Sequence, residues 1–145
     1  MAFAYALQLA AHHIINQAKG LLSLVNDSEF SLAPSRNLIS EKKISVPQVL
    51  RSHWEDMALL DERFQVMTGL LVRQIEQVNR RLDDWIDYKE LSKSMSQEEM
   101  KETHPEVEKH LEDIETAADH LFGELEEWMQ KTTTIDQSNR SKAVK

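Results

Sequence analysis

Hydrophobic residues recur at spacings of three and four over three long segments of the chain, which is the period of an amphipathic helix. The first such segment is 2–25. Its stripe consists of Phe3, Leu7, Ala10, Ile14, Ala18, Leu21 and Val25. Further apolar residues, Tyr5 and Leu9 among them, widen the stripe beyond one face. A helix that is apolar over so much of its circumference is usually buried by more than one neighbour. We therefore predict that helix 2–25 packs against more than one other helix.

A second helix, the longest of the three, is predicted over 47–91. Ser45 is a suitable N-cap and Pro47 suits a first turn, while Gly69 is the one weak point. The residues that recur every seven positions are Leu50, Met57, Phe64, Leu71, Val78 and Trp85. A shorter stripe on another face consists of Leu59, Val66 and Leu70. We therefore expect the middle of this helix to be covered on two sides, with Phe64 and Leu71 at the centre of the core.

A third helix is predicted over 105–131. Thr103 and Glu106 form a capping box, with Pro105 just inside the start. The stripe that follows is Val107, Leu111, Ile114, Ala118, Leu121, Leu125 and Trp128. The segment 26–46 is predicted to be a linker. Residues 132–145 are polar and carry no stripe, so we predict a disordered tail.

These segments predict an all-α fold: an elongated bundle of three main helices, one of them very long and central, with coiled-coil-like packing in a single domain over 1–131. At 1.5 Å per residue the helices are roughly 36, 68 and 40 Å long. The two shorter helices barely cover the long one. Apolar stripe left uncovered normally marks an interface. We therefore expect an elongated monomer, a homo-oligomer or a protein that needs a partner, and not a spherical monomer.

Composition supports this interpretation and narrows the compartment. The 145 residues include three glycines and three prolines, so few breakers interrupt the helices. The absence of cysteine excludes disulfides and thiolate metal sites, and fits an intracellular location in the cytoplasm or nucleus. The segment 1–20 lacks the basic start of a signal peptide and is too polar to span a membrane. Contact of helix 2–25 with a membrane surface stays an alternative.

Charge is segregated along the chain. The net charge is −8, and residues 97–127 hold twelve acidic residues against Lys101 and Lys109. Because nucleic-acid binding needs a basic face to neutralise phosphates, we expect no nucleic-acid partner. The opposite charges lie in and after the linker, at Arg36, Lys42, Lys43 and Arg51. We predict that these basic residues lie near the acidic third helix, either of the same chain or of a neighbouring one.

The residues that could bind a metal or take part in catalysis do not have the spacing that these functions need. His12 and His13 are adjacent and point about 100° apart, while His110 and His120 are almost three turns apart. No metalloprotease or di-iron spacing occurs, and no nucleophile elbow or phosphate-binding loop. We therefore expect no enzyme, no metal site and no cofactor. The carboxylates of the third helix lie mostly off its stripe and face water.

The pattern favours a non-enzymatic helical adaptor, or a small subunit of a larger intracellular assembly, acting through helix–helix contacts with a protein partner or a second copy. The residues expected at the interface are Trp128, Glu112, Glu115, Asp119, Trp54 and Trp85. Tryptophan is enriched at binding hot spots, and acidic residues speed the encounter with a basic partner. One alternative is an immunity-type inhibitor that masks a basic site; another is a peripheral membrane protein that uses helix 2–25.

Overall fold

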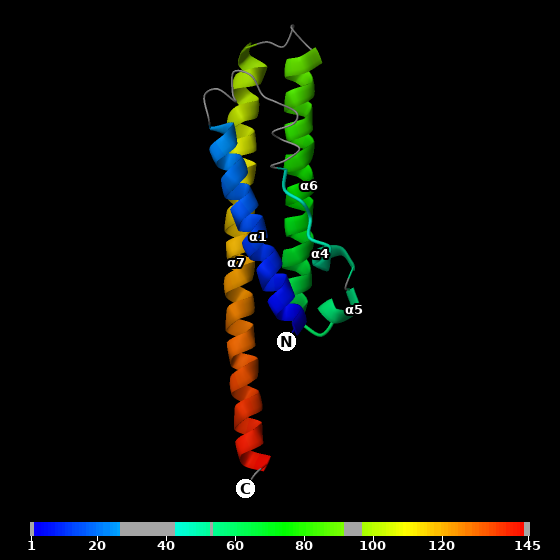
Figure 1. The fold of residues 1–145 in the computed structure, drawn as a ribbon, viewed down its shortest axis with the longest axis vertical. Helices are drawn as coiled ribbons and strands as arrows, with labels where there is room; N and C mark the ends of the chain where they lie inside the picture. Colours follow the sequence, from blue (N-terminus) through cyan, green and yellow to red (C-terminus); the bar gives the residue numbers. More distant parts are fainter. Residues whose placement is uncertain (1, 27–42, 53, 92–96, 144–145) are drawn as a thin grey trace.

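The structure, a computed structural model, describes the backbone of residues 2–26, 43–52, 54–91 and 97–143, and their side chains except at 52, 54, 85–91, 97–103 and 134–143. Over this range the chain is all-α, without strands, and elongated (Figure 1). The three main helices are α1 (Ala2–Val25), α6 (Glu62–Leu91) and α7 (Gln97–Ala143). Two short helices precede α6: α4 (Val49–Ser52) and α5 (Trp54–Met57).

Helix α7 is the centre of the bundle, because α1 and α6 both pack along it. Both run antiparallel to α7 (Figure 1). Besides Gln8 and Ala10, the buried residues of α1 alternate at three and four: Ala4, Leu7, Ala11, Ile14, Ala18, Leu21 and Val25. Those of α7 do nearly the same: Val107, Leu111, Ile114, Ala118, Leu121, Leu125 and Met129. This spacing forms the seam of a coiled coil. The predicted all-α bundle of three main helices is therefore confirmed.

The very long central helix, however, is not the predicted one. Helix α7 has 47 residues and extends past both ends of the predicted 105–131. Pro105 lies inside it and not at its first turn. The predicted disordered tail was also wrong for 132–143, which form the last turns of α7. No glycine or proline follows Gly123, so the packed part of α7 can propagate one residue at a time without a breaker.

The predicted continuous helix over 47–91 was wrong, because the chain turns at 58–61 before α6 begins. The backbone amide of Phe64 donates to the carbonyl of Asp61 at 3.0 Å and starts the new helix. A straight helix would carry Leu50 and Met57 beyond the start of α1, which lies level with the start of α6 (Figure 1). By folding back, the chain buries both side chains. Tertiary packing thus overrides a breaker-free sequence.

The segment 43–50 runs back along α1 and α6. Ile44 is buried, and the side-chain amide of Asn79 on α6 donates to its carbonyl at 2.8 Å. Lys43 forms an ion pair with Asp83 at 2.8 Å, and Arg51 on α4 forms one with Glu76 at 3.0 Å. These basic residues therefore pair with α6, and the predicted contact with the acidic helix α7 of the same chain was wrong for both. Arg36 and Lys42 lie outside the described residues.

The predicted core centre is confirmed, since Phe64 and Leu71 are both buried. In the turn of α6 between them, Thr68 is buried and the apolar Met67 only partly. The Thr68 hydroxyl donates to the carbonyl oxygens of Phe64 and Gln65 of its own helix. A polar group that is hydrogen-bonded in this way can occupy a core position at little cost.

Candidate protein-interaction surfaces

Trp128 lies in the seam between α6 and α7. Its ring is half-buried and meets the ring of Phe64 edge-to-face, with the centroids 6.1 Å apart. This is a preferred geometry for an aromatic pair. Trp54 and Trp85 belong to α5 and α6, but their side chains lie outside the described residues. Among the predicted interface tryptophans, the described one therefore holds two helices of the bundle together.

The predicted acidic interface residues divide into two groups. Glu115 is half-buried, and its carboxylate lies 3.8 Å from the ammonium group of Lys19 on α1. Glu112 and Asp119 are exposed. They form no ion pair with any residue that the structure describes, and the same holds for Asp113 and Glu127. We call these four exposed acids the acidic row: Glu112, Asp113, Asp119 and Glu127.

The structure does not bring Trp128 onto one surface with Glu112 and Asp119. Residue 128 follows them by sixteen and nine positions, which at 100° per residue places it on nearly the opposite side of α7 from both. Their burial agrees, because Trp128 faces the seam while Glu112 and Asp119 face water. A partner that contacts Glu112 and Asp119 would not reach the indole.

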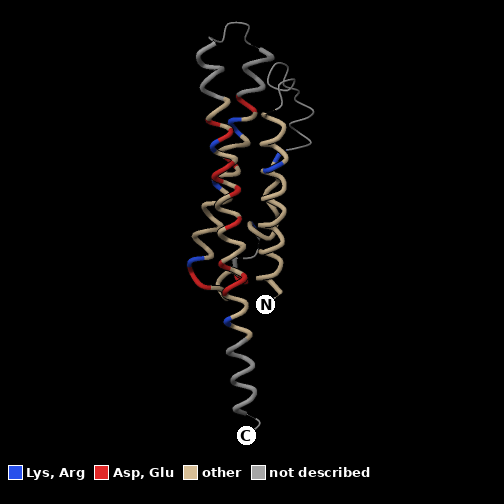
Figure 2. The backbone as a smooth tube through the Cα atoms, turned by 90° about the vertical axis from the view of Figure 1, so that its left-hand side faces the viewer, with Lys and Arg blue, Asp and Glu red and all other residues tan. Residues whose placement is uncertain are grey.

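Other acids of α7 hold the bundle together. Glu106 pairs with Arg81 at 2.8 Å, and Glu124 pairs with Arg63 at 2.7 Å, both across the contact with α6. Glu126 accepts a hydrogen bond from the side-chain amide of Gln8 on α1 at 2.6 Å. Figure 2 shows the charged positions concentrated on α6 and α7, while α1 is almost wholly uncharged. Exposed pairs of this kind are weak individually, but together they offset part of the acidic excess of α7.

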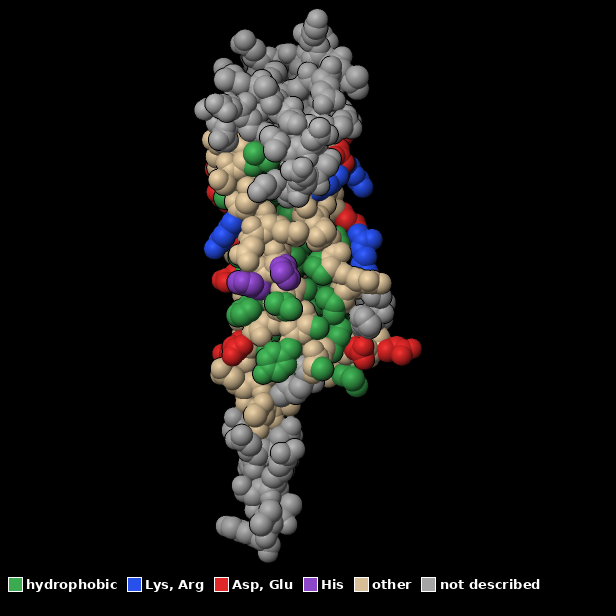
Figure 3. Space-filling view, viewed as in Figure 1, with side chains coloured by type: hydrophobic (Ala, Val, Ile, Leu, Met, Phe, Trp, Pro, Cys, Tyr) green, Lys and Arg blue, Asp and Glu red, His purple; other side chains and the backbone are tan. Residues whose placement is uncertain are grey.

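The outer face of α1 is uncharged and partly apolar. The exposed residues that line it are Ala2, Tyr5, Ala6, Leu9, His13 and Asn16. Tyr5 is 62% exposed and Leu9 is 59% exposed, and no charged residue precedes Lys19. Figure 3, which looks onto the face that carries α1, shows hydrophobic side chains gathered there. Although α1 packs against both α7 and α4, as its wide stripe predicts, two of its largest apolar side chains stay uncovered.

The outer face of α6 is the second uncovered apolar surface. On α6, Val66 is 59% exposed and Leu70 is 53% exposed, and Leu59 in the preceding turn is 78% exposed. The prediction that a second neighbour covers this stripe was therefore wrong within the described part of the chain. The segment 43–52, which precedes α6 in the chain, lies along another side of α6, between α6 and α1.

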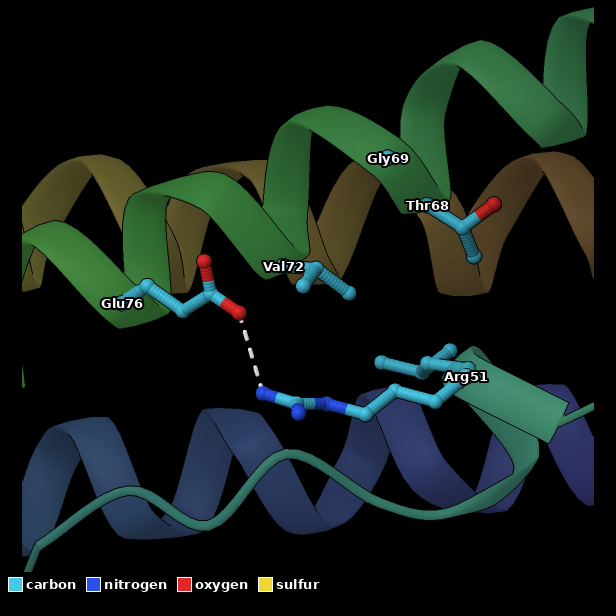
Figure 4. A pocket seen from close by; sticks show the side chains of 6 residues that line it. Arg51, Thr68, Gly69, Val72 and Glu76 are labelled. Atoms are coloured by element: carbon cyan, nitrogen blue, oxygen red, sulfur yellow. Dashed lines mark hydrogen bonds and ion pairs between the residues drawn. The ribbon is translucent and has the colours of Figure 1, made fainter.

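A hollow of about 330 Å³ lies beside this face, between α4 and α6 (Figure 4). The residues that line it are Leu50, Arg51, Thr68, Gly69, Val72 and Glu76. Its charged groups are already paired, because Arg51 reaches across to Glu76. Its hydroxyl is bonded within α6. The hollow therefore has a partly apolar wall, and none of its lining side chains is placed to act as a nucleophile or to transfer a proton.

His104 and His12 have structural neighbours. The imidazole Nε2 of His104 on α7 lies 2.9 Å from the carbonyl oxygen of Val25, the last residue of α1. It therefore caps the end of α1, where carbonyl groups lack helical partners. The ring of His12 lies 6.3 Å from that of Phe122, and its Nε2 is 3.3 Å from the amide nitrogen of Asn16.

Neither a metal site nor a membrane span emerges from the part of the chain that the structure describes. No three His, Asp or Glu side chains gather there closely enough to hold an ion. None of the helices there has an apolar stretch long enough to cross a bilayer. The fold and its surfaces define a three-helix bundle with two uncovered apolar faces. Compared with protein-family models, curated proteins and solved structures, the chain finds no match.

Proposed function

We propose that this protein is a non-enzymatic helical adaptor, or a small subunit of a larger intracellular assembly, and that the outer face of α1 docks a helix of its protein partner. One observation carries the proposal: Tyr5 and Leu9 are more than half exposed on a helix with no charged residue before Lys19. Surface helices usually present charged residues to water. An uncharged outer face is typical of a helix that is covered in its working state.

The chemistry of this face defines the partner segment. Burying apolar surface contributes roughly 25 cal/mol per Å², and the outer face of α1 itself carries no charge that has to be desolvated. Tyr5 also borders a hollow of about 390 Å³ at the start of α1, lined by Met129, Gln130 and Thr133 of α7 and by Glu126, whose carboxylate already accepts a hydrogen bond from Gln8. A large apolar side chain of a partner helix fits such a place, with the tyrosine as the anchor. The partner helix should therefore carry an apolar stripe at spacings of three and four.

Site-specific photo-crosslinking tests the proposal. A photoreactive residue is placed at Leu9 in the full chain, in cells that produce it, with a matched probe at the exposed Thr116 on the outer face of α7. We expect one discrete cross-linked protein from position 9, and its loss when Tyr5→Glu is added. Circular dichroism checks that Tyr5→Glu leaves the fold intact, since the side chain is exposed. Equal products from both positions, or none from position 9, would refute docking at α1.

A second candidate function is the immunity-type inhibitor, and the acidic row favours it. Four exposed acids without ion pairs in the described part of the chain present a surface for a basic site. Electrostatic complementarity mainly accelerates association. If the inhibitor function is right, Glu112→Gln with Asp119→Asn slows association and flattens its salt dependence, while Leu9→Glu has no effect. Flotation with neutral lipid vesicles separates the membrane alternative, in which Leu9→Glu abolishes vesicle binding and no cross-linked protein forms.

A further inference from the structure

The outer face of α6 has a pattern that the bundle does not use. At its centre lie Val66 and Leu70, both more than half exposed, and Gly69 lies at the edge that borders the hollow against α4. A Cβ atom at Gly69 would meet nothing within 4 Å. A glycine at this place lets the backbone of another helix approach closely.

Opposite charges flank this apolar centre. Glu62 lies one turn before Val66, and Arg73 lies one turn after Leu70, so all four share the outer face of α6. Both charged side chains are exposed, and neither forms an ion pair with a described residue. The two are eleven positions apart, about three turns or roughly 16 Å along the helix.

This order of residues is complementary to itself when reversed. If a second α6 lies antiparallel with its centre between residues 67 and 68, Glu62 of each copy lies opposite Arg73 of the other. Val66 of each copy then faces Gly69 of the other. A parallel arrangement would instead place Glu62 against Glu62. Opposite charges across an interface fix orientation and register, so the face selects the antiparallel partner.

The charge of the remaining surface supports a second copy at this face. The chain carries a net charge of −8, and the acidic row makes the outer face of α7 repel another molecule of the same chain. The outer face of α6 is balanced between Glu62 and Arg73. We propose that a second copy of this chain packs antiparallel on α6, about a two-fold axis that passes between residues 67 and 68, with Glu62–Arg73 ion pairs at both ends.

The dimer should be weak and reversible. A three-turn helix pair buries less than the roughly 800 Å² per partner of a standard interface. Sedimentation equilibrium of the full chain at low salt, over a micromolar to millimolar range, should therefore show a monomer–dimer equilibrium. The symmetry makes each substitution act twice in the dimer.

Charge exchange tests the geometry. Glu62→Arg and Arg73→Glu each place like charges opposite one another, so each should weaken dimerisation about tenfold or more. The double variant restores both pairs and should return to within about threefold of the natural chain. Glu112→Arg, which reverses an equally exposed charge on α7, is the matched control and should not weaken dimerisation. Circular dichroism verifies that all variants fold.

Three results would overturn the proposal. The first is a monomer at every concentration, even if cross-linking through α6 captures a different protein. The second is a double variant that stays as weak as the single ones, which excludes the antiparallel register. The third is an equal loss on Glu112→Arg, which would show a general charge effect. None of these results bears on docking at α1, which is tested separately by the probe at Leu9.

Discussion

Replacing Phe64 with alanine should destabilise the protein more than any single change on its surface. The side chain is fully buried, and its ring meets Trp128 of α7 edge-to-face. Truncating a buried phenylalanine costs about 3–5 kcal/mol, because apolar contacts are lost and a cavity remains. Phe64 lies in the first turn of α6 and faces α7. Removing its ring should therefore loosen the contact that joins these two helices.

Part of that free energy belongs to the ring pair and can be separated. Edge-to-face pairs contribute about 0.5–1.5 kcal/mol beyond the area they bury. Thermal and urea unfolding would be followed by far-ultraviolet circular dichroism for Phe64→Ala, Trp128→Ala, the double variant and the natural chain. We expect a coupling of that size in the double-mutant cycle. Gln77→Ala, exposed on the same helix, serves as the control and should change stability by less than about 0.5 kcal/mol.

The outcome that contradicts this reasoning is a loss below about 1 kcal/mol for Phe64→Ala, or no coupling with Trp128. The first would mean that α6 does not place Phe64 in the core. The second would mean that Trp128 does not lie in the seam between α6 and α7, and would restore it as a candidate for an external interface.

Three further changes test other parts of the structure. Gly123→Ala should stabilise α7 by about 0.5–1 kcal/mol, because a Cβ atom added there would meet nothing within 4 Å. If urea unfolding showed no gain in stability, that would contradict a regular helix at this position. Asn79→Ala should cost about 1–3 kcal/mol, since it removes the donor to the carbonyl of Ile44, and hydrogen exchange should accelerate over 44–50; unchanged exchange would argue against the fold-back. Glu112→Gln should raise the melting temperature slightly at low salt and not at high salt, because it relieves repulsion from Glu108 and Glu115; equal effects at both would exclude charge as the cause.

The hydrophobic pattern predicted which residues face the core better than it predicted where helices break. Periodicity identified α1 with its observed bounds and placed Phe64 and Leu71 in the core. It failed at 58–61, where no glycine or proline marks the turn. That turn exists because Leu50 and Met57 find burial only by folding back. A local pattern cannot contain this information, since it depends on where α1 begins in space.

The predicted interface shows a similar limit. The density of acids in 97–127 was visible in the sequence, but not that α1 and α6 would pair with some of them, through Lys19, Arg63 and Arg81. The stripe also placed Trp128 at the last seam position, although Met129 is the more deeply buried of the two. One signal could have indicated the outer face of α1 earlier: a helix with no charged residue before Lys19 cannot present a charged surface to water.

The distribution of charge supports the proposals that contacts with other molecules use α1 and α6. Helix α7 contacts both neighbours, so its flanking acids find cations on α1 and α6, while its outer acids face water. Like charges on that outer face keep copies of this chain apart there. The outer face of α1 has no charge, and that of α6 has a balanced pair around Gly69. Uncharged and self-complementary faces accept neighbours without the cost of burying an unpaired charge. If both proposals are right, the central acidic helix directs association to the two helices that flank it.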